Sequence, residues 1–419
     1  MTQAIKTYLV GGAVRDELLG IASQDKDYVV VGASAKHMLD QGYLAVGKDF
    51  PVFLHPKSKH EYALARIERK IDKGYTGFSV EAGAQVSLED DLARRDLTIN
   101  AIAKDENGSL IDPFNGQNDL NNKILRHVTD AFSEDPVRVL RIARFRARYG
   151  KNWQIHPDTH ELIKQIKAKG ELEYLVPERI WKETEKALNE QQAHVFFETL
   201  EELDVLDVLF PELAVMRNIP QPPEHHPEGD VFVHTLLVLK RACDLGFSAA
   251  TRFAALCHDF GKPISHAKQG NLHNHEEAGV PIVEAFCERL RIPNKLKDLG
   301  MLTSKNHLLS HRIFELQAKT LYRMIIEDFS AVKQPERFLQ FLQACQCDAQ
   351  GRGETLVNRP YPQRDFGEYL LAELQKFDAK SAVQEAIEKG KNGPLIGDWV
   401  RQRTIACIKV AKASYIRPE

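Results

Sequence analysis

The stretch that sets the fold of the N-terminal part is Tyr8-Leu9-Val10-Gly11-Gly12-Ala13-Val14-Arg15-Asp16, which reads as a strand, a tight glycine turn and the start of a helix. Backbone N–H groups at such a turn, beginning with that of Gly12, can approach a triphosphate, and Arg15 adds a positive charge beside it. Gly-Gly turns are common, so this stretch alone is weak evidence for a phosphate site.

Two aspartates, Asp25 and Asp27, follow this stretch and lead into the apolar run Val29-Val30-Val31. In a strand, residues i and i+2 share a face, so both carboxylates point to the same side of a sheet. Carboxylates aligned in this way suit Mg²⁺, which binds one or two carboxylates together with substrate phosphates and water. An isolated Asp-x-Asp is more often a solvated acidic turn, so the rest of the sequence has to decide.

Two further segments are rich in arginine. The first is Arg94-Arg95-Asp96-Leu97-Thr98-Ile99-Asn100, whose side chains can hold the phosphates and the sugar of a nucleotide. The second runs from Glu134 to Arg144 and places four charged residues three apart on one helical face, next to the helix start at Pro136: Asp135, Arg138, Arg141 and Arg144. Each segment, taken alone, is equally typical of a solvated, salt-bridged surface.

The composition is that of an ordinary globular protein, with 43% apolar and 27% charged residues in 419. No stretch approaches the roughly 20 apolar residues of a membrane span, so we expect a cytoplasmic protein without membrane contact. The six cysteines show no C-x-x-C spacing, which argues against a zinc ribbon or a disulfide framework. The net charge of −3 argues against nucleic acid as a partner only if it is spread evenly, and Arg138 to Lys151 holds five arginines and no acid.

The pattern along the chain changes near residue 125. Before it, short β-rich runs alternate with turn signals; from Asp135 the apolar spacing is helical to the end. A Pro-rich stretch from Ile219 to Pro227 interrupts the helices and is a candidate linker. Beyond it, histidines concentrate between His234 and His311, which indicates a second site.

Taken together and in this order, Gly-Gly-x-x-Arg-Asp, Asp-x-Asp, Arg-Arg-Asp-Leu-Thr-Ile-Asn and Glu-Asp-x-x-Arg-x-x-Arg resemble the class II tRNA nucleotidyltransferases of the polymerase-β superfamily. The resemblance is to the bacterial CCA-adding enzymes and covers the whole chain. It implies an α+β fold with a polymerase-β-like nucleotidyltransferase head of mixed sheet and helices, an all-helical neck and body, and a helical HD domain. The corresponding boundaries are 1–125 for the head, 126–222 for the neck and body, 223–350 for the HD domain and 351–419 for a helical tail.

For the head, the resemblance implies an enzyme that adds CCA to tRNA from CTP and ATP and releases pyrophosphate. Asp25 and Asp27 would be catalytic and hold two Mg²⁺ ions, with Glu61 as a less certain third acid. The nucleotide would be bound by Gly12, Arg15, Arg95, Asp96, Asn100, Asp135, Arg138, Arg141 and Arg144. The charged, Gly-punctuated segment 66–78 resembles the flexible loop that helps such enzymes change from CTP to ATP.

Base choice has a physical argument. Cytosine and adenine both present an exocyclic amino donor next to a ring-nitrogen acceptor, so one carboxylate and one guanidinium can read both bases. Asp135 would accept from the amino group, and Arg138 would donate to the ring nitrogen. Uracil and guanine present a carbonyl where Asp135 needs a donor, which excludes them.

The histidine-rich region resembles the H…HD…D pattern of metal-dependent phosphohydrolases. The matching residues are His234, His258, Asp259 and Asp348, which would bind a divalent ion such as Ni²⁺ or another transition metal. Further contacts to metal or substrate would come from Lys262, His273, His275, His307 and His311. The resemblance implies 2′,3′-cyclic phosphodiesterase, 2′-nucleotidase and phosphatase activity on damaged tRNA ends.

Other functions stay open at this point. A poly(A) polymerase would share the head but lack the HD domain, and an enzyme that adds only A or only CC differs from the favoured one in short loops. In a further alternative, the HD domain is the main enzyme and the head senses nucleotides. Expected partners are tRNA with an immature or damaged 3′ end, CTP and ATP, and the protein is a monomer or a homodimer.

Overall fold

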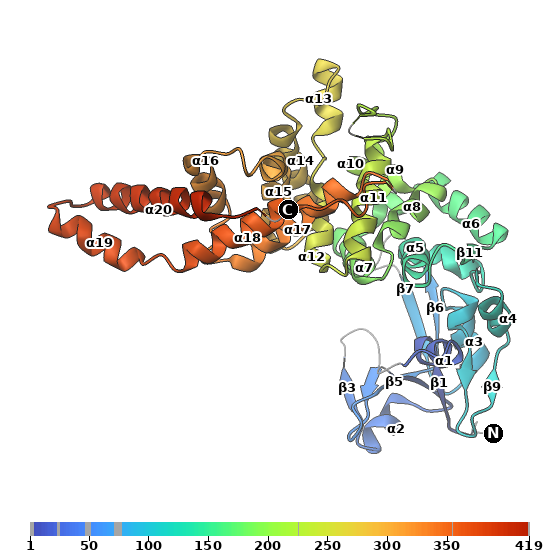
Figure 1. Ribbon diagram of the computed structural model, residues 1–419. Coiled ribbons are helices and arrows are strands. Elements are labelled where there is room, and N and C mark those ends of the chain that lie inside the picture. Colours follow the sequence, from blue (N-terminus) through green and yellow to red (C-terminus); the bar gives the residue numbers. More distant parts are fainter. Residues whose placement is uncertain are drawn as a thin grey trace. The chain divides into compact units, whose positions relative to one another are not determined.

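The computed structural model describes residues 4–22, 26–46, 52–70, 78–224, 226–353 and 355–417 (Figure 1). The chain forms two compact units, Met1–Glu183 with Thr199–Leu209, and Thr184–Glu198 with Phe210–Glu419. None of the described helices combines the length and the apolarity that crossing a membrane requires.

A mixed sheet organises the first part of the chain. Its seven strands lie in the order β3 (Leu44–Val46), β4 (Val52–Leu54), β5 (Glu61–Leu64), β2 (Asp27–Val31), β1 (Lys6–Val10), β8 (Ala103–Lys104) and β9 (Leu110–Ile111). Only β2 and β5 run parallel; the other neighbours are antiparallel.

The valines of β2 explain why this strand lies inside the sheet. Val29 and Val31 belong to the core on one face, together with Val10 and Leu92, while Val30 belongs to the core on the other face. Side chains of a strand alternate between faces, so a run of three valines requires a sheet that is covered on both sides. The buried strand expected at Asp27–Val31 is confirmed.

A separate two-stranded antiparallel ribbon, β6 (Arg66–Lys70) and β7 (Phe78–Ala82), spans the segment that resembles a flexible loop. Residues 71–77, the centre of that segment, lie outside the described residues.

Short helices surround the sheet, and longer ones follow it. The elements of this part are α1 (Gly12–Leu18), α2 (Ala35–Asp40), α3 (Leu88–Ala93), η1 (Thr98–Asn100), α4 (Gly116–Asn121), β10 (Ile124–Leu125), η2 (Asp130–Glu134), α5 (Val137–Tyr149), β11 (Gln154–Ile155), α6 (Pro157–Ala168), η3 (Glu171–Tyr174), α7 (Pro177–Asn189), α8 (Ala193–Glu202) and α9 (Leu206–Leu209). In α5 the apolar positions Val139, Leu140, Ile142 and Ala143 are fully buried, which confirms the helical spacing read from the sequence.

The second unit is helical within the described ranges. Its helices are α10 (Pro211–Ala214), α11 (Val231–Asp244), α12 (Ala249–Cys257), α13 (Lys262–Gln269), α14 (His275–Leu290), α15 (Asn294–His311), α16 (Ala318–Tyr322), η4 (Arg323–Asp328), α17 (Pro335–Gln350), α18 (Pro362–Gln375), α19 (Ala379–Glu388) and α20 (Pro394–Ser414). Figure 1 shows α19 and α20, in red, running side by side, and α20 also packs against α16 and α18. The main core of this unit lies between α15, α17 and α18 and contains Phe338, Phe341 and Leu370.

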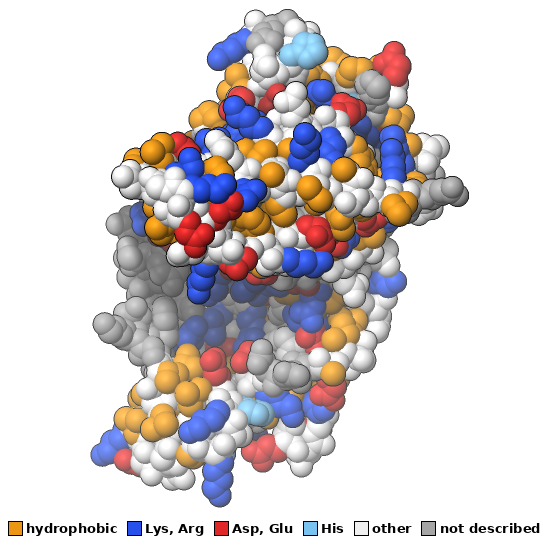
Figure 2. Space-filling model, turned by 60° about the vertical axis from the view of Figure 1, so that its left-hand side comes forward, with side chains coloured by type: hydrophobic (Ala, Val, Ile, Leu, Met, Phe, Trp, Pro, Cys, Tyr) orange, Lys and Arg blue, Asp and Glu red, His pale blue; other side chains and the backbone are white. Residues whose placement is uncertain are grey.

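The fold class is therefore confirmed: a head built on a mixed sheet is followed by helices. Figure 2 shows acidic and basic side chains interspersed over the visible face, as the small net charge predicts. Local groups of like charge thus come from particular elements rather than from an overall bias.

Candidate nucleotide and metal sites

The acidic residue Asp27 lies at the first position of β2. Its neighbour in β1 is Val10, the residue before the Gly-Gly turn, and its neighbour in the parallel strand β5 is Glu61. Both acids are exposed, and directly paired residues of neighbouring strands point to the same face. The sheet thus brings two oxygen donors together beside the glycine turn, which is the donor chemistry that Mg²⁺ prefers. Asp25 lies outside the described residues.

The glycine turn is backed by arginines. Gly11 has a φ of +68°, a conformation that favours glycine, and a Cβ at this position would lie 2.7 Å from Nη1 of Arg95. Asn100 connects two of the predicted binding residues: its side-chain oxygen accepts from Nη1 of Arg15 at 2.5 Å, and its backbone oxygen accepts from Arg95 at 3.4 Å. The structure therefore places Gly12, Arg15, Arg95 and Asn100 in one region.

Asp96 joins this region to helix α5. One carboxylate oxygen accepts from Nδ2 of Asn100 at 2.9 Å, and the other accepts from Nε of Arg141 at 2.7 Å. Burial raises the pKa of this carboxyl, but Arg141 and Asn100 outweigh it and hold the pKa well below its usual range. Asp96 is therefore a structural anion that fixes the arginines around it.

Residues near the start of α5 make internal contacts of their own. Arg179 binds the carboxylate of Asp135 through both terminal nitrogens, at 2.9 and 2.8 Å. Arg138 donates to the backbone oxygens of Ala131 at 2.9 Å and Arg94 at 2.6 Å. Asp135 and Arg138 thus lie one helical turn apart, each with a fixed orientation.

One predicted binding residue faces into the fold, and two residues without a predicted role make contacts in this region. Arg144 is buried and donates to Glu183 at 2.7 Å, so its charge is neutralised inside the fold. Arg179 had no signal in the sequence, because its partner Asp135 is far away along the chain. Asp16 was part of the quoted glycine motif without an assigned role; it binds Arg15 at 2.7 Å and Arg148 at 3.1 Å.

A group of histidines and aspartates lies in the second unit. Ligand atoms of His234, His258 and Asp348 are within 4.8 Å of one another, and all three side chains are buried. Asp259 completes the predicted set, since its carboxylate lies 3.0 Å from Nε2 of His258 and 3.7 Å from Nε2 of His234. His234 lies in α11, His258 and Asp259 directly follow α12, and Asp348 lies in α17, so the fold brings these distant positions of the predicted pattern together.

A second group shares Asp259 with the first. Ligand atoms of Asp259, His275 and His307 also lie within 4.8 Å of one another. Burial, followed by the neighbouring His275, lowers the pKa of His307 to about 3, so this ring is neutral at physiological pH. A neutral imidazole is the form that binds a metal.

The histidine rings are oriented by their Nδ1 atoms. Nδ1 of His234 lies 2.7 Å from Glu228 without a hydrogen bond of good geometry among the described residues. Those of His258, His275 and His307 lie 2.6–2.8 Å from backbone carbonyl oxygens. An Nδ1–H that donates to such an acceptor leaves Nε2 with its lone pair. The Nε2 atoms then face one another in pairs, at 3.3 Å for His234 and His258 and at 3.1 Å for His275 and His307.

The buried carboxylate of Asp259 has the surroundings expected of a metal ligand. Both carboxylate oxygens of Asp259 are buried and accept no hydrogen bond of good geometry within the described part of the chain, although Lys262 lies 2.5 Å away. Burial raises the pKa of Asp259, but His258 and Lys262 outweigh it and keep the pKa well below the usual value. An ionised, buried carboxylate among facing imidazole lone pairs is a donor set that a divalent transition ion satisfies.

Several residues around the cluster were missed by sequence reasoning or have a different position. His226, from the Pro-rich stretch, and Glu228, which directly follows it, form a further group with His234. Lys262 donates to Gln221 at 2.6 Å in addition to its contact with Asp259. His273 is exposed and lines a cavity of about 620 Å³ that also reaches His275.

Comparisons with known proteins identify three segments. Residues 7–126 match the poly A polymerase head domain, residues 152–216 match a probable RNA and SrmB-binding site of polymerase A, and residues 231–330 match the HD domain. The match at 231–330 agrees with the expectation that this chain carries an HD domain.

Relatives match over nearly the whole length. The chain is 50% identical to the multifunctional CCA protein of Teredinibacter turnerae over 98% of this chain and 99% of the relative. It is 49% identical to that of Thioalkalivibrio sulfidiphilus over 98% and 100%.

Solved structures share the fold. The CCA-adding enzyme of Bacillus stearothermophilus in complex with CTP has a TM-score of 0.65 and 24% identity over 97% of this chain and 89% of that one. The CCA-adding enzyme of Thermotoga maritima complexed with tRNA has a TM-score of 0.61 and 19% identity over 98% and 91%.

Proposed function

The chain belongs to the family of multifunctional CCA proteins, and we propose that it rebuilds the 3′-terminal CCA of tRNA from CTP and ATP without a nucleic-acid template. Identity of about one half over nearly the entire chain supports this reaction, as does the HD domain, which a poly(A) polymerase is expected to lack. The observation that carries the proposal is the position of Asp27, beside the glycine turn in β1 and beside Glu61 in β5.

In the transfer step, the 3′-hydroxyl oxygen of the tRNA forms a bond to the α-phosphorus of the nucleotide. The bond from that phosphorus to the bridging oxygen breaks, pyrophosphate leaves, and the hydroxyl proton passes to solvent. Asp25 and Asp27, with Glu61 beside them, are the residues that would hold Mg²⁺. Such ions, when bound, neutralise the triphosphate and acidify the attacking hydroxyl. Arg15 and Arg95 bind the phosphates near Gly12.

Asp135 and Arg138 select the base. The carboxylate of Asp135 accepts from the amino group of cytosine or adenine, and Arg138 donates to the ring nitrogen. The bidentate contact with Arg179 supports this role, because it fixes the plane of the Asp135 carboxylate. Arg141, through Asp96, keeps α5 next to the phosphate-binding arginines.

A single assay tests this function. The protein is incubated with tRNA that lacks its terminal CCA, together with Mg²⁺ and labelled CTP and ATP. Addition of two C and one A, followed by arrest, is the expected result. Repeated A addition, or addition of only A or only CC, would identify one of the other enzymes; no incorporation would leave only the HD site as an enzyme.

The HD domain has a second activity in this proposal: hydrolysis of 2′,3′-cyclic phosphates, 2′-phosphates and other phosphomonoesters at damaged RNA ends. In ring opening, a water oxygen bonds to phosphorus and one ribose oxygen leaves with a proton. One metal position uses His234, His258, Asp259 and Asp348, and a second uses Asp259, His275 and His307. A divalent ion such as Ni²⁺ at these positions would supply water activation.

His258→Ala provides the test for the HD site in the full chain. Loss of phosphohydrolase activity with unchanged CCA addition is expected, because the residue belongs to the cluster alone. Hydrolysis at the original rate would show that this cluster is not the hydrolytic site.

A further inference from the structure

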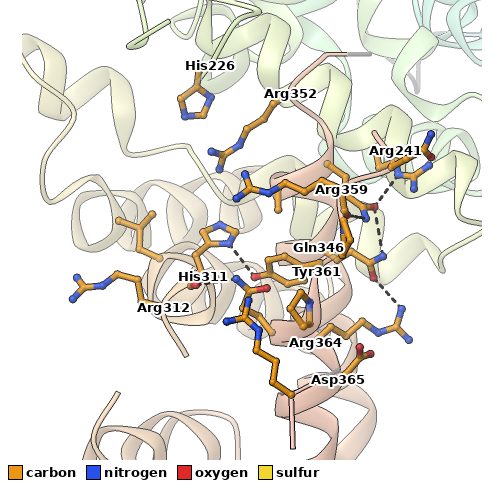
Figure 3. Close-up of a pocket in the computed structure, with 18 residues that line it drawn as sticks. His226, Arg241, His311, Arg312, Gln346, Arg352, Arg359, Tyr361, Arg364 and Asp365 are labelled. Atoms are coloured by element: carbon orange, nitrogen blue, oxygen red, sulfur yellow. Dashed lines mark hydrogen bonds between the residues drawn. The ribbon is translucent and has the colours of Figure 1, made fainter. Parts of the chain in front are cut away.

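A large cavity lies next to the histidine and aspartate cluster (Figure 3). Its volume is about 1400 Å³, above the roughly 300–1000 Å³ of pockets that enclose one small ligand. The segment between α17 and α18 forms one wall with Arg359 and Tyr361, and the first turn of α18 adds Arg364. This wall belongs to the region after residue 350, where the sequence motifs predict no ligand.

Arginines outnumber acids among the described residues that line the cavity. They are Arg241, Arg312, Arg352, Arg359, Arg364 and Arg417, and Asp365 is the one acid among those residues. Such an excess of guanidinium groups, which form paired hydrogen bonds to phosphate oxygens, favours a ligand with more than one phosphate.

Three residues connect the cavity to the cluster. Arg352 binds Asp348 at 3.0 Å, and Nε2 of His311 lies 2.6 Å from the other oxygen of Asp348. His226 lines the cavity and also belongs to the group with Glu228 and His234. Figure 3 shows the guanidinium groups of Arg352 and Arg359 pointing into the space between His226 and His311. A ligand in the cavity therefore lies next to residues that themselves contact the cluster.

The guanidinium groups of Arg352 and Arg359 differ in their ion pairing. Arg352 is paired with Asp348, whereas the exposed side chain of Arg359 has no ion pair or hydrogen bond with any residue in the described ranges. Arg364 is partly neutralised, since Nε donates to Glu368 at 2.7 Å. The unpaired charge of Arg359 is thus available for an anion from outside the chain.

We propose that this cavity binds the phosphodiester on the 5′ side of the terminal nucleotide, so that the HD site takes an RNA 3′ end in preference to a free mononucleotide. The inference rests on the proposed hydrolytic function of the cluster. A strand whose terminal phosphate lies at the cluster continues through its 5′ oxygen, and its next phosphate needs a cation outside the cluster. Arg359 supplies that cation, and the cavity has room for a second nucleotide.

Tyr361 fixes the wall that carries Arg359. Its buried hydroxyl lies 2.9 Å from Nδ1 of His311 and 3.2 Å from the hydroxyl of Ser310. The backbone oxygen of Arg359 accepts from Gln350 at 2.7 Å. Since these contacts tie the wall to α15 and α17, the position of Arg359 relative to the cluster is set by the fold.

The experiment compares three substrates with the full chain and the divalent ion that supports its hydrolysis. They are adenosine 2′,3′-cyclic phosphate, a 5′-phosphorylated diadenosine ending in a 2′,3′-cyclic phosphate, and the same dinucleotide with an uncharged methylphosphonate linkage. The natural dinucleotide is expected to have the highest kcat/KM. Arg359→Ala should lower kcat/KM for it roughly tenfold, the loss expected for one charged contact, and leave the other two substrates unchanged.

Arg323→Ala is the matched control, because Arg323 is exposed in the same unit and lies outside the cavity wall. It should leave all three rates unchanged. Equal kcat/KM values for the two dinucleotides would overturn the proposal while the hydrolytic function stands. The same holds if Arg359→Ala lowers kcat/KM equally for all three substrates.

A binding measurement tests the cavity independently of the hydrolytic function. The dissociation constant of the labelled natural dinucleotide is measured for the three proteins, and Arg359→Ala should weaken binding roughly tenfold relative to Arg323→Ala. If the cluster hydrolyses none of the substrates, this difference still supports the cavity as an RNA site; equal affinities reject it.

Discussion

The imidazole rings of His275 and His307 face each other through their Nε2 atoms at 3.1 Å, while each Nδ1 lies within 2.8 Å of a backbone carbonyl oxygen. With both Nδ1–H groups donating, two lone pairs meet at short distance beside the carboxylate of Asp259. A shared cation removes this repulsion. The second metal position that we propose for the HD domain rests on this relationship.

The first prediction concerns metal content. His307→Ala removes one of the three ligands of this position, so the purified full chain should retain one divalent ion fewer per molecule after dialysis, as measured by mass spectrometry of the metals. His160→Ala, a histidine of α6 in the other unit, is the control. An unchanged metal content in the His307 variant contradicts a second position.

The second prediction concerns base selection. Arg179→Ala frees the Asp135 carboxylate to rotate, so discrimination of CTP and ATP against UTP and GTP should fall roughly tenfold, the effect of one hydrogen-bond contact. Arg179→Lys keeps the charge but not the two parallel hydrogen bonds, so its discrimination should lie between that of the wild type and that of Arg179→Ala. The discrimination is measured as the ratio of kcat/KM with CTP or ATP to kcat/KM with UTP or GTP, with tRNA as the acceptor. Wild-type ratios in both variants would show that Arg179 has no role in base selection.

The third prediction concerns pH. The pKa of Asp96 is depressed in the folded protein, so its contribution to stability is present above the usual carboxyl pKa of 3.8 and is lost as the pH falls below it. Asp96→Asn should lower the melting temperature by roughly 2–8 °C near neutral pH. The difference from wild type should shrink in melts at about pH 3. A difference that is equal at both pH values argues against an ionised Asp96.

The fourth prediction concerns a close backbone approach. A Cβ at Gly261 would collide with the carbonyl oxygen of His275 and lie 2.5 Å from the backbone nitrogen of Gly279. Gly261→Ala should therefore push the start of α13 away from α14 and lengthen the 3.3 Å contact between His275 and Asp259. Weaker metal binding with normal CCA addition is expected in titration and activity assays.

The control for this change is Gly397→Ala in α20, where the new Cβ meets no atom within 4 Å. Metal affinity in the Gly261 variant equal to that of the Gly397 variant would mean that the spacing of α13 and α14 does not matter for the cluster.

Much of the fold could be predicted because its elements carry periodic signals. The valines of β2 and the apolar positions of α5 read correctly as a buried strand and an amphipathic helix. The strands β8 and β9 contain two residues each, too few for a period, although the turn signal Asn107-Gly108 lies between them. The mixed direction of the sheet also depends on packing that no local pattern contains.

Some residues of the candidate sites could likewise be predicted from the sequence, and others could not. His234, His258 and Asp348 come together as the pattern implied, since their residue types and order were informative. The contact between Asp135 and Arg179 exists only in the folded chain, so neither residue indicates the other. His226 lies in a stretch whose prolines are typical of a linker, and Glu228 directly follows it, which concealed their place beside the cluster.

Helix α17 carries Asp348 near its end, and the chain that leaves it forms the cavity wall with Arg359 and Tyr361. A recombinant fragment cut just after Gln350 would contain every ligand of the metal cluster, yet His311 would lose its contact with Tyr361. Anyone isolating the hydrolytic part of this protein should therefore extend the fragment through α18, to Gln375 or beyond.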